Sequence, residues 1–169
     1  MQLVIIGNGA AGLSALSRFR ALDKDSEVTL ISAEEATAYS RVLLPYYLRR
    51  KIPYRNLFIR QSDDYEALGV QTEFGTPVSR VEPDSRRLTL ADGRSILFDK
   101  LLIATGSRPF LPPIEGLAGS KVLHLWTLQD TERLDTLFEP GKRALILGSG
   151  FIALQAAWAA QQRELKVTV

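Results

Sequence analysis

Short runs of consecutive apolar residues divide the first part of the chain into strands and a helix. Residues 2–6 (Gln-Leu-Val-Ile-Ile) and 28–31 form such runs, which are typical of strands buried on both faces of a parallel sheet. Between them, Ala15, Phe19 and Leu22 recur at helical spacing. The pattern therefore predicts a βαβ unit at the start of the chain.

The middle of the chain changes its pattern twice. Residues 41–51 and 63–68 predict short helices, and the first should begin or kink at Pro45 because proline removes an intrahelical hydrogen bond. Residues 70–98 carry short strands separated by turn signals, which predicts an antiparallel meander inserted as a crossover. A second buried strand is expected at residues 101–104.

A second βαβ unit is predicted near the end of the chain. Proline and glycine gather in residues 107–119, which favours a linker, and residues 127–138 predict a helix. Another strand, glycine turn and helix begin at Arg143 and lead to a strand at 165–169. Because a parallel strand needs neighbours, we expect the native polypeptide to continue past this strand, or another chain to complete the sheet.

Composition narrows the function classes. The chain has 169 residues, of which 46% are hydrophobic and 24% charged, and a net charge of +2, so it is expected to be globular without a nucleic-acid partner. It has no cysteine, which excludes disulfides and cysteine-ligated metal centres within these residues, and no spacing suggests a metal site. No apolar run reaches membrane-spanning length and the first strand begins at Gln2, so we expect a cytoplasmic protein without membrane contact.

The first glycine-rich turn, Gly-Asn-Gly-Ala-Ala-Gly at residues 7–12, follows a strand and opens a helix. This G-x-G-x-x-G pattern is typical of a dinucleotide site, in which the three glycines permit a tight turn, close approach of a diphosphate and helix packing. An acidic residue about 20 positions further on should bind the ribose hydroxyls, and Glu34 fits this spacing. The alternative is that Glu34 and its neighbour Glu35 are surface charges. The candidate ligands here are Gly7, Gly9, Ala10, Ala11, Gly12 and Glu34.

A second turn of the same kind follows the strand that begins at Arg143. Gly148 and Gly150 keep the first two glycine positions, and Ala153 replaces the third. The candidate ligands of this turn are Gly148, Gly150, Phe151 and Ile152. Two such turns on one chain predict two dinucleotides and electron transfer between them, while the residue that separates NADH from NADPH would lie past Val169.

Three segments carry a resemblance to a known family. Residues 7–12, residues 101–109 (Leu-Leu-Ile-Ala-Thr-Gly-Ser-Arg-Pro) and residues 148–150 resemble the FAD-dependent pyridine nucleotide–disulfide oxidoreductase superfamily. Residues 39–47 (Tyr-Ser-Arg-Val-Leu-Leu-Pro-Tyr-Tyr) resemble its branch of NAD(P)H nitrite reductases and rubredoxin reductases. The resemblance implies an α/β fold. It consists of a Rossmann-like FAD-binding domain with an inserted β-meander (1–108), a linker (109–119) and the truncated start of a Rossmann-like NAD(P)-binding domain (120–169).

The resemblance also implies further site residues. Arg41 would lie near the ADP half of FAD, where a guanidinium suits phosphate oxygens; the alternative is an exposed cation at a helix start. Val78 would offer backbone groups to adenine. Ala104, Thr105 and Gly106 would lie beside the pyrophosphate or ribityl chain, unless they form a plain turn at the end of a strand.

The activity implied by the resemblance is hydride transfer from NAD(P)H to FAD and onward electron transfer to a redox acceptor protein or domain of unknown identity. The chain departs from the family at three positions. Val42 stands where some members have a redox cysteine, Tyr46 where some have a lysine near the flavin, and Gln155 where the second turn usually has glutamate. We therefore expect no side chain to act as acid, base or nucleophile. A non-catalytic FAD-binding or assembly module is the alternative, and a homodimer is compatible with either.

Overall fold

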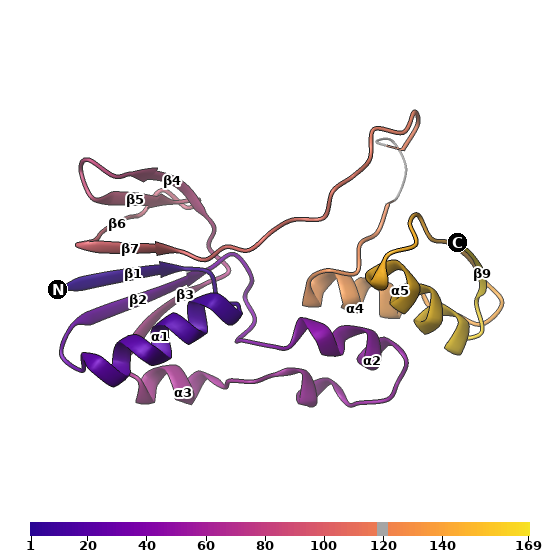
Figure 1. The fold of residues 1–169 in the computed structure, drawn as a ribbon, viewed down its shortest axis with the longest axis horizontal. Helices are drawn as coiled ribbons and strands as arrows, with labels where there is room; N and C mark the ends of the chain where they lie inside the picture. The colour runs from indigo at the N-terminus through magenta and orange to yellow at the C-terminus, as the bar shows by residue number, and fades with distance from the viewer. Residues whose placement is uncertain (118–121) are drawn as a thin grey trace. The chain divides into compact units, whose positions relative to one another are not determined.

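The chain was analysed as a computed structural model that describes residues 1–117 and 122–169 (Figure 1). It consists of two compact units, Met1–Tyr39 with Phe58–Ser107, and Ser40–Leu57 with Arg108–Val169. The last two residues of the expected linker, 118 and 119, and the first two of the expected second domain, 120 and 121, lie outside the described residues.

The first unit is built on a four-stranded parallel sheet with the order β3-β2-β1-β7. Its strands are β1 (Gln2–Ile6), β2 (Glu27–Ser32), β3 (Val70–Phe74) and β7 (Lys100–Ile103). In register, Ile5 of β1 is opposite Leu30 of β2 on one side and Leu102 of β7 on the other. The parallel α/β arrangement predicted from the apolar runs is confirmed.

Figure 1 shows helices on one face of this sheet and an antiparallel meander on the other. Each face buries a core of its own. Ile5 faces α1 (Ala10–Leu22) and α3 (Ser62–Ala67), whereas Val4 and Ile6 face a three-stranded antiparallel meander. The meander consists of β4 (Val78–Glu82), β5 (Arg87–Leu90) and β6 (Ser95–Leu97). Alternate residues of one strand point to opposite faces, and because both faces are covered, β1 is apolar from Leu3 to Ile6.

The inner face of α1 includes a charged residue. Leu13, Leu16 and Arg20 are buried, while Leu22 is 71% exposed. Arg20 is accepted inside because its guanidinium donates hydrogen bonds to backbone carbonyls, at 2.7 Å to Leu68 and 2.8 Å to Gly69. A buried charge requires hydrogen-bond partners of this kind. The spacing of apolar residues in the sequence does not reveal these partners.

Two strand predictions also need correction. The segment from Val70 does not belong to the meander, because β3 pairs in parallel with β2, with Val70 opposite Val28. The strand expected to be buried at 101–104 is only half-buried, and Ile103 is 60% exposed. The reason is position: β7 is an edge strand of the sheet, whereas β1 and β2 are central.

The second unit contains the second βαβ motif. Strands β8 (Arg143–Leu145) and β9 (Lys166–Thr168) pair in parallel and are joined by α5 (Phe151–Gln162), as predicted. The helix α4 (Leu128–Leu137) precedes them and is capped by Thr127, whose hydroxyl accepts a hydrogen bond from the Asp130 N–H.

Residues 40–57 belong to this second unit as well. They form η1 (Arg41–Leu43), α2 (Leu44–Leu48) and η2 (Tyr54–Leu57), and α2 packs on α4 and α5. Pro45 lies in the first turn of α2, where its missing N–H costs nothing. The sequence therefore located this helix start correctly, although the packing partners of the helix lie more than 80 residues further along the chain.

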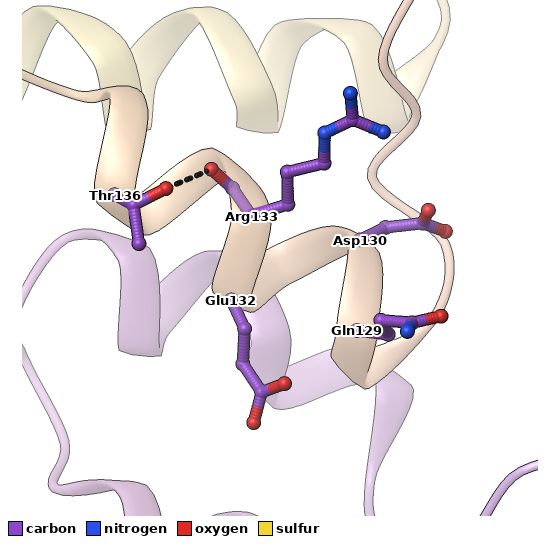
Figure 2. A pocket seen from close by; sticks show the side chains of 5 residues that line it. All are labelled: Gln129, Asp130, Glu132, Arg133 and Thr136. Carbon is purple, nitrogen blue, oxygen red and sulfur yellow. Dashed lines mark hydrogen bonds between the residues drawn. The ribbon is translucent and has the colours of Figure 1, made fainter.

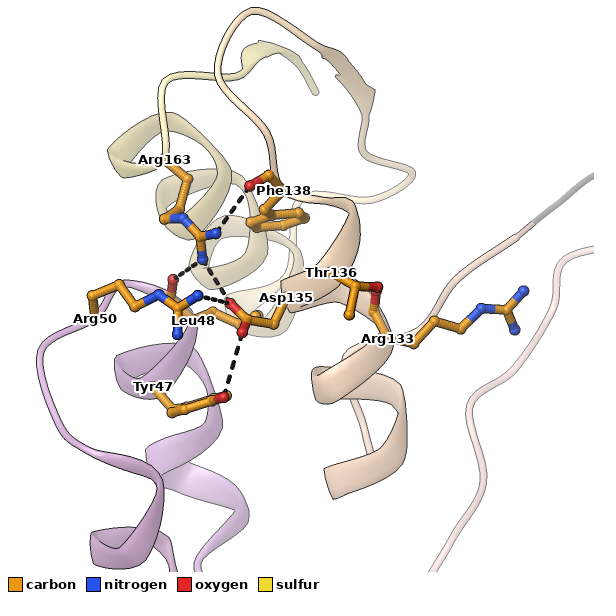
Figure 3. Close-up of polar contacts among 8 residues, drawn as sticks. All are labelled: Tyr47, Leu48, Arg50, Arg133, Asp135, Thr136, Phe138 and Arg163. Carbon is orange, nitrogen blue, oxygen red and sulfur yellow. Dashed lines mark hydrogen bonds and ion pairs between the residues drawn. The ribbon is translucent and has the colours of Figure 1, made fainter.

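A polar cluster joins these helices (Figure 3). The Asp135 carboxylate accepts a hydrogen bond of 2.7 Å from Arg163 Nη1, lies 3.0 Å from Arg50 Nη2 and is 3.4 Å from the Tyr47 hydroxyl. Arg163 also donates to the Leu48 carbonyl at 3.2 Å. One carboxylate thus links α2, Arg50 just beyond it, α4 and Arg163 at the end of α5.

Candidate functional site

The first glycine turn has a backbone that only glycine adopts easily. Gly7 has a φ of +118°, and a Cβ at this position would overlap the carbonyl group of Ala104. Its N–H donates to the Ile31 carbonyl at 2.8 Å, which continues the β1–β2 ladder into the turn. The turn is therefore placed between the ends of β2 and β7.

The other two glycines of this turn differ in their surroundings. A Cβ on Gly12 would overlap the Gly7 carbonyl, so glycine is required where the helix meets its own turn. Gly9 has an ordinary extended backbone, and no atom lies within 4 Å of its Cβ position. The space next to Gly9 is open, as the approach of a bound group requires.

The N-terminus of α1 is available to an anion. The helix begins at Ala10, Gly9 provides no side-chain cap, and its first turn carries no acidic residue. Gly9, Ala10 and Ala11 are exposed. The first N–H groups of a helix lack intrahelical partners and carry partial positive charge, so this end suits a phosphate.

Glu34 lies two residues beyond β2, in the loop that passes close to the glycine turn. Its side chain is half-buried, and Oε2 accepts a hydrogen bond of 2.6 Å from the Tyr39 hydroxyl. Its carbonyl accepts a hydrogen bond from the Gly75 N–H at 3.1 Å. Glu35 is exposed, and its side chain lies where a Cβ of Gly75 would be.

The residues after β7 reach the same edge of the sheet. The Ala104 N–H donates to the Ile6 carbonyl at 2.7 Å, and Thr105 and Gly106 follow as exposed residues. The structure thus brings Gly7, Glu34 and Ala104 together at the carboxyl ends of β1, β2 and β7. Ligands of open parallel sheets bind at this edge.

Val78 and Arg41 belong to other elements of the chain. Val78 begins β4, is half-buried and is opposite Leu90 of β5. Arg41 belongs to the second unit, where its guanidinium donates to the Trp126 carbonyl at 2.9 Å and lies 5.2 Å from the centre of the Trp126 ring. Their roles toward a cofactor remain predictions.

The second turn repeats the backbone of the first. Gly148 has a φ of +117°, and Gly150 is the uncapped N-cap of α5. Phe151 is 90% exposed and Ile152 is 52% exposed. Gln155, at the position where the sequence pattern departs from the family, has a buried Oε1 without a hydrogen-bond partner among the described residues.

Sequence reasoning missed a polar contact inside the first turn. The hydroxyl of Tyr65, on α3, donates a hydrogen bond of 2.9 Å to Asn8 Oδ1. Asn8 stands between the first two glycines, and Tyr65 lies in a short acidic helix that was predicted only as a helix. Tyr65 is the single aromatic residue of that helix. From the sequence, this indicates that its side chain is buried, but it does not show that its hydroxyl bonds to Asn8.

A separate hollow of about 440 Å³ lies along α4 in the second unit (Figure 2). Its lining residues are Gln129, Asp130, Glu132, Arg133 and Thr136. None of them is a predicted site residue. The part of the chain that the structure describes holds no group of three potential metal ligands, and none of its helices has the length and apolar character needed to cross a membrane.

Comparison with known proteins agrees with this geometry. The family model described as pyridine nucleotide-disulphide oxidoreductase matches residues 1–169. The rhodocoxin reductase of Rhodococcus erythropolis is 32% identical over 170 residues, covering 100% of this chain and 40% of the relative. The putidaredoxin reductase of Pseudomonas putida is 32% identical over 174 residues, covering 99% of this chain and 41% of the relative.

Solved structures show the same fold. An NAD-dependent persulfide reductase from A. fulgidus superposes with a TM-score of 0.90 at 30% identity, over 99% of this chain and 33% of that one. The putidaredoxin reductase–putidaredoxin complex gives 0.88 at 28% identity, over 98% of this chain and 41% of that one. The chain thus spans 37–42% of the length of the first curated relatives it matches.

Proposed function

Because the chain belongs to the pyridine nucleotide-disulphide oxidoreductase family, we propose that it is part of an FAD-dependent NAD(P)H oxidoreductase. The observation that carries this proposal is the repetition of one glycine turn. Gly7 and Gly148 have φ values of +118° and +117°, and each turn leads into a helix whose N-cap provides no side-chain bond. Two anion-binding helix starts of the same construction suit two dinucleotides.

FAD fits the first turn. The N–H groups at the start of α1 would hold its diphosphate, and the open space beside Gly9 would admit it. The Glu34 carboxylate would accept hydrogen bonds from the ribose hydroxyls, with Tyr39 holding its orientation. Residues 104–106 would lie along the pyrophosphate or ribityl chain, and Arg41 and Val78 would contact the ADP half.

NAD(P)H fits the second turn, through Gly148, Gly150, Phe151 and Ile152. When bound, the flavin supplies the redox chemistry, accepting hydride and passing electrons on. The chain's own contribution is to bind and orient. No acid, base or nucleophile is assigned among the described residues, and Val42 leaves the thiol position of some relatives without sulfur.

The electron acceptor is proposed to be a separate redox protein or an attached redox domain. The names of two relatives, rhodocoxin reductase and putidaredoxin reductase, support a small electron-carrier protein. The name of a third, nitrite reductase [NAD(P)H] of Bacillus subtilis, supports an attached domain; this relative is 30% identical over 157 residues, which make up 20% of its length.

Anaerobic reduction tests the activity. The complete protein is saturated with FAD, and the visible absorbance of the flavin is followed after addition of NADH or NADPH. Bleaching by either nucleotide is the expected result. A yellow protein that neither nucleotide bleaches would favour the non-catalytic flavin-binding module, and a protein that takes up no FAD would refute both.

Paired glycine variants test the assignment of the two turns. Gly9→Val fills the open space at the first turn and should abolish FAD retention while the fold survives, because no atom of the described residues lies within 4 Å of its Cβ position. Gly150→Val makes the matching change at the second turn, where no atom lies within 4 Å either. It should spare FAD and impair reduction by NAD(P)H. Unchanged FAD occupancy in Gly9→Val would remove Gly9 from the site.

A further inference from the structure

The hydroxyl of Tyr65 connects two loops at the carboxyl edge of the sheet. Tyr65 is 2% exposed, and its ring packs edge-on against Phe74 with the ring centres 5.3 Å apart. Its oxygen accepts a hydrogen bond of 3.1 Å from the Ala38 N–H and donates one of 2.9 Å to Asn8 Oδ1. Asn8 lies in the glycine turn after β1, and Ala38 lies in the loop after β2.

The direction of these bonds determines how Asn8 is held. A phenol has one proton, and the Ala38 N–H can only donate, so the hydroxyl proton is free for Asn8. In the structure the oxygen of the Asn8 amide faces Tyr65 and accepts this proton. Nδ2 is buried and has no hydrogen-bond partner in the described part of the chain. The contact with Tyr65 is thus the hydrogen bond that orients this side chain.

Both loops carry proposed ligand groups. Asn8 separates Gly7 from Gly9, beside the expected diphosphate position. Ala38 directly precedes Tyr39, whose hydroxyl binds the Glu34 carboxylate expected at the ribose. A single buried hydroxyl therefore connects the turn expected to bind the diphosphate with the loop expected to bind the ribose.

We propose that Tyr65 is a positioning residue of the first dinucleotide site and that it acts through Asn8 and Ala38. This inference rests on the proposed binding of FAD at the first turn. Tyr65 touches no part of the ligand itself. It holds the turn and the Glu34 loop in their bound spacing before the ligand arrives, so that less ordering is needed on binding.

Tyr65→Phe keeps the buried ring and removes only the oxygen, leaving the Ala38 N–H and Asn8 Oδ1 without their partner. We expect the dissociation constant of FAD to rise about tenfold, as loss of one buried hydrogen-bonding group predicts. The matched control is Tyr54→Phe, which removes a hydroxyl bonded to Glu132 in the second unit. It should change the dissociation constant less than about twofold.

The measurement is a titration of flavin-free complete protein with FAD, followed by flavin fluorescence, for Tyr65→Phe, Asn8→Ala and the double variant. Because both single changes remove the same bond, the double variant should lose less affinity than the product of the two single losses. At saturating FAD, the phosphorus resonances of the bound diphosphate should shift in Tyr65→Phe and not in Tyr54→Phe. A residue needed only for core packing would not move them.

Four results would overturn the inference. If the unchanged protein binds FAD and Tyr65→Phe binds it within twofold, Tyr65 has no positioning role and the proposed function stands. Losses that multiply fully in the double variant would also contradict it. If the unchanged protein binds no FAD, the proposed function and the inference fail together. Should Tyr65→Phe not fold, Asn8→Ala removes the same bond from a half-buried turn, and an unchanged affinity in that variant would refute the inference.

Discussion

The Cα of Gly7 faces the carbonyl group of Ala104 so closely that no side-chain carbon fits between them. The two residues are far apart in the sequence and meet because β1 and β7 are neighbours in the parallel sheet. The contact determines how near the residues after β7 approach the first glycine turn. It also distinguishes this turn from the second one. There, the Ala153 Cβ at 3.8 Å is the sole atom of the described residues near the corresponding position of Gly148.

Gly7→Ala should therefore destabilise the fold much more than Gly148→Ala. Both changes place a side chain at a φ near +118°, which costs about 1–2 kcal/mol. At Gly7 the overlap with Ala104 adds about 1–3 kcal/mol. Urea unfolding of both variants measures the difference. Equal losses of unfolding free energy would show that the Ala104 carbonyl does not constrain the turn.

Asp135→Asn should weaken the second unit, because two guanidinium groups lose the charge that they share. The carboxylate is 14% exposed and its Arg163 partner 18%, so the cluster is only partly screened by water. Loss of one partner of a largely buried ion pair predicts a destabilisation of about 2–4 kcal/mol. Thermal or urea unfolding monitored by circular dichroism measures it.

Glu139→Gln provides the control for this change. It removes the carboxylate of the Lys142–Glu139 pair, in which both side chains are at least half exposed. Such pairs contribute about 0–1 kcal/mol. If both substitutions proved equally mild, the Asp135 cluster would not hold α2 on α4 and α5.

The hydroxyl of Tyr54 should lose its proton at an unusually high pH. Burial, followed by the hydrogen bond that its hydroxyl donates to Glu132 Oε1 at 2.7 Å, raises the pKa of Tyr54 to about 12. An unfolded tyrosine has a pKa of about 10. The folded state therefore holds the proton more tightly, and this contribution to stability is complete below about pH 10 and is lost as the pH rises through about 12.

The ultraviolet absorbance of tyrosinate measures this pKa, with Tyr54→Phe subtracted to isolate the one residue. Glu132→Gln keeps an acceptor and removes the negative charge, so the pKa of Tyr54 should fall partway toward 10. A Tyr54 that titrates near pH 10 in the unchanged protein would contradict the contact with Glu132.

Local signals predicted much of the fold because their physical causes are local. Continuous apolar runs identified β1 and β2, whose two faces are both covered. Pro45 marked a helix start because of its missing N–H, and α4 begins where residues 127–138 predicted a helix. The positive φ of Gly7 and Gly148 follows from the same kind of reasoning, since the turn after each strand requires it.

Features that depend on distant partners could not be predicted in this way. Val70–Phe74 has the composition of a meander strand, and only the sheet shows that it pairs in parallel with β2. Arg20 interrupts an apolar face, and its burial makes sense only once the carbonyls of Leu68 and Gly69 lie beside it. The role proposed for Tyr65 likewise depends on Asn8, which is 57 positions away.

The amino-acid sequence alone determined that this chain has two glycine turns, each between an apolar strand and a helix, because strand burial, helix starts and glycine conformations are set by near neighbours. The folded structure decided which groups surround the first turn. The Ala104 carbonyl, the Glu34 loop and the Tyr65 hydroxyl come together there only after the strands have paired. The reason is that hydrogen bonds and van der Waals contacts act over short distances, and these residues come close to one another only when the chain is packed.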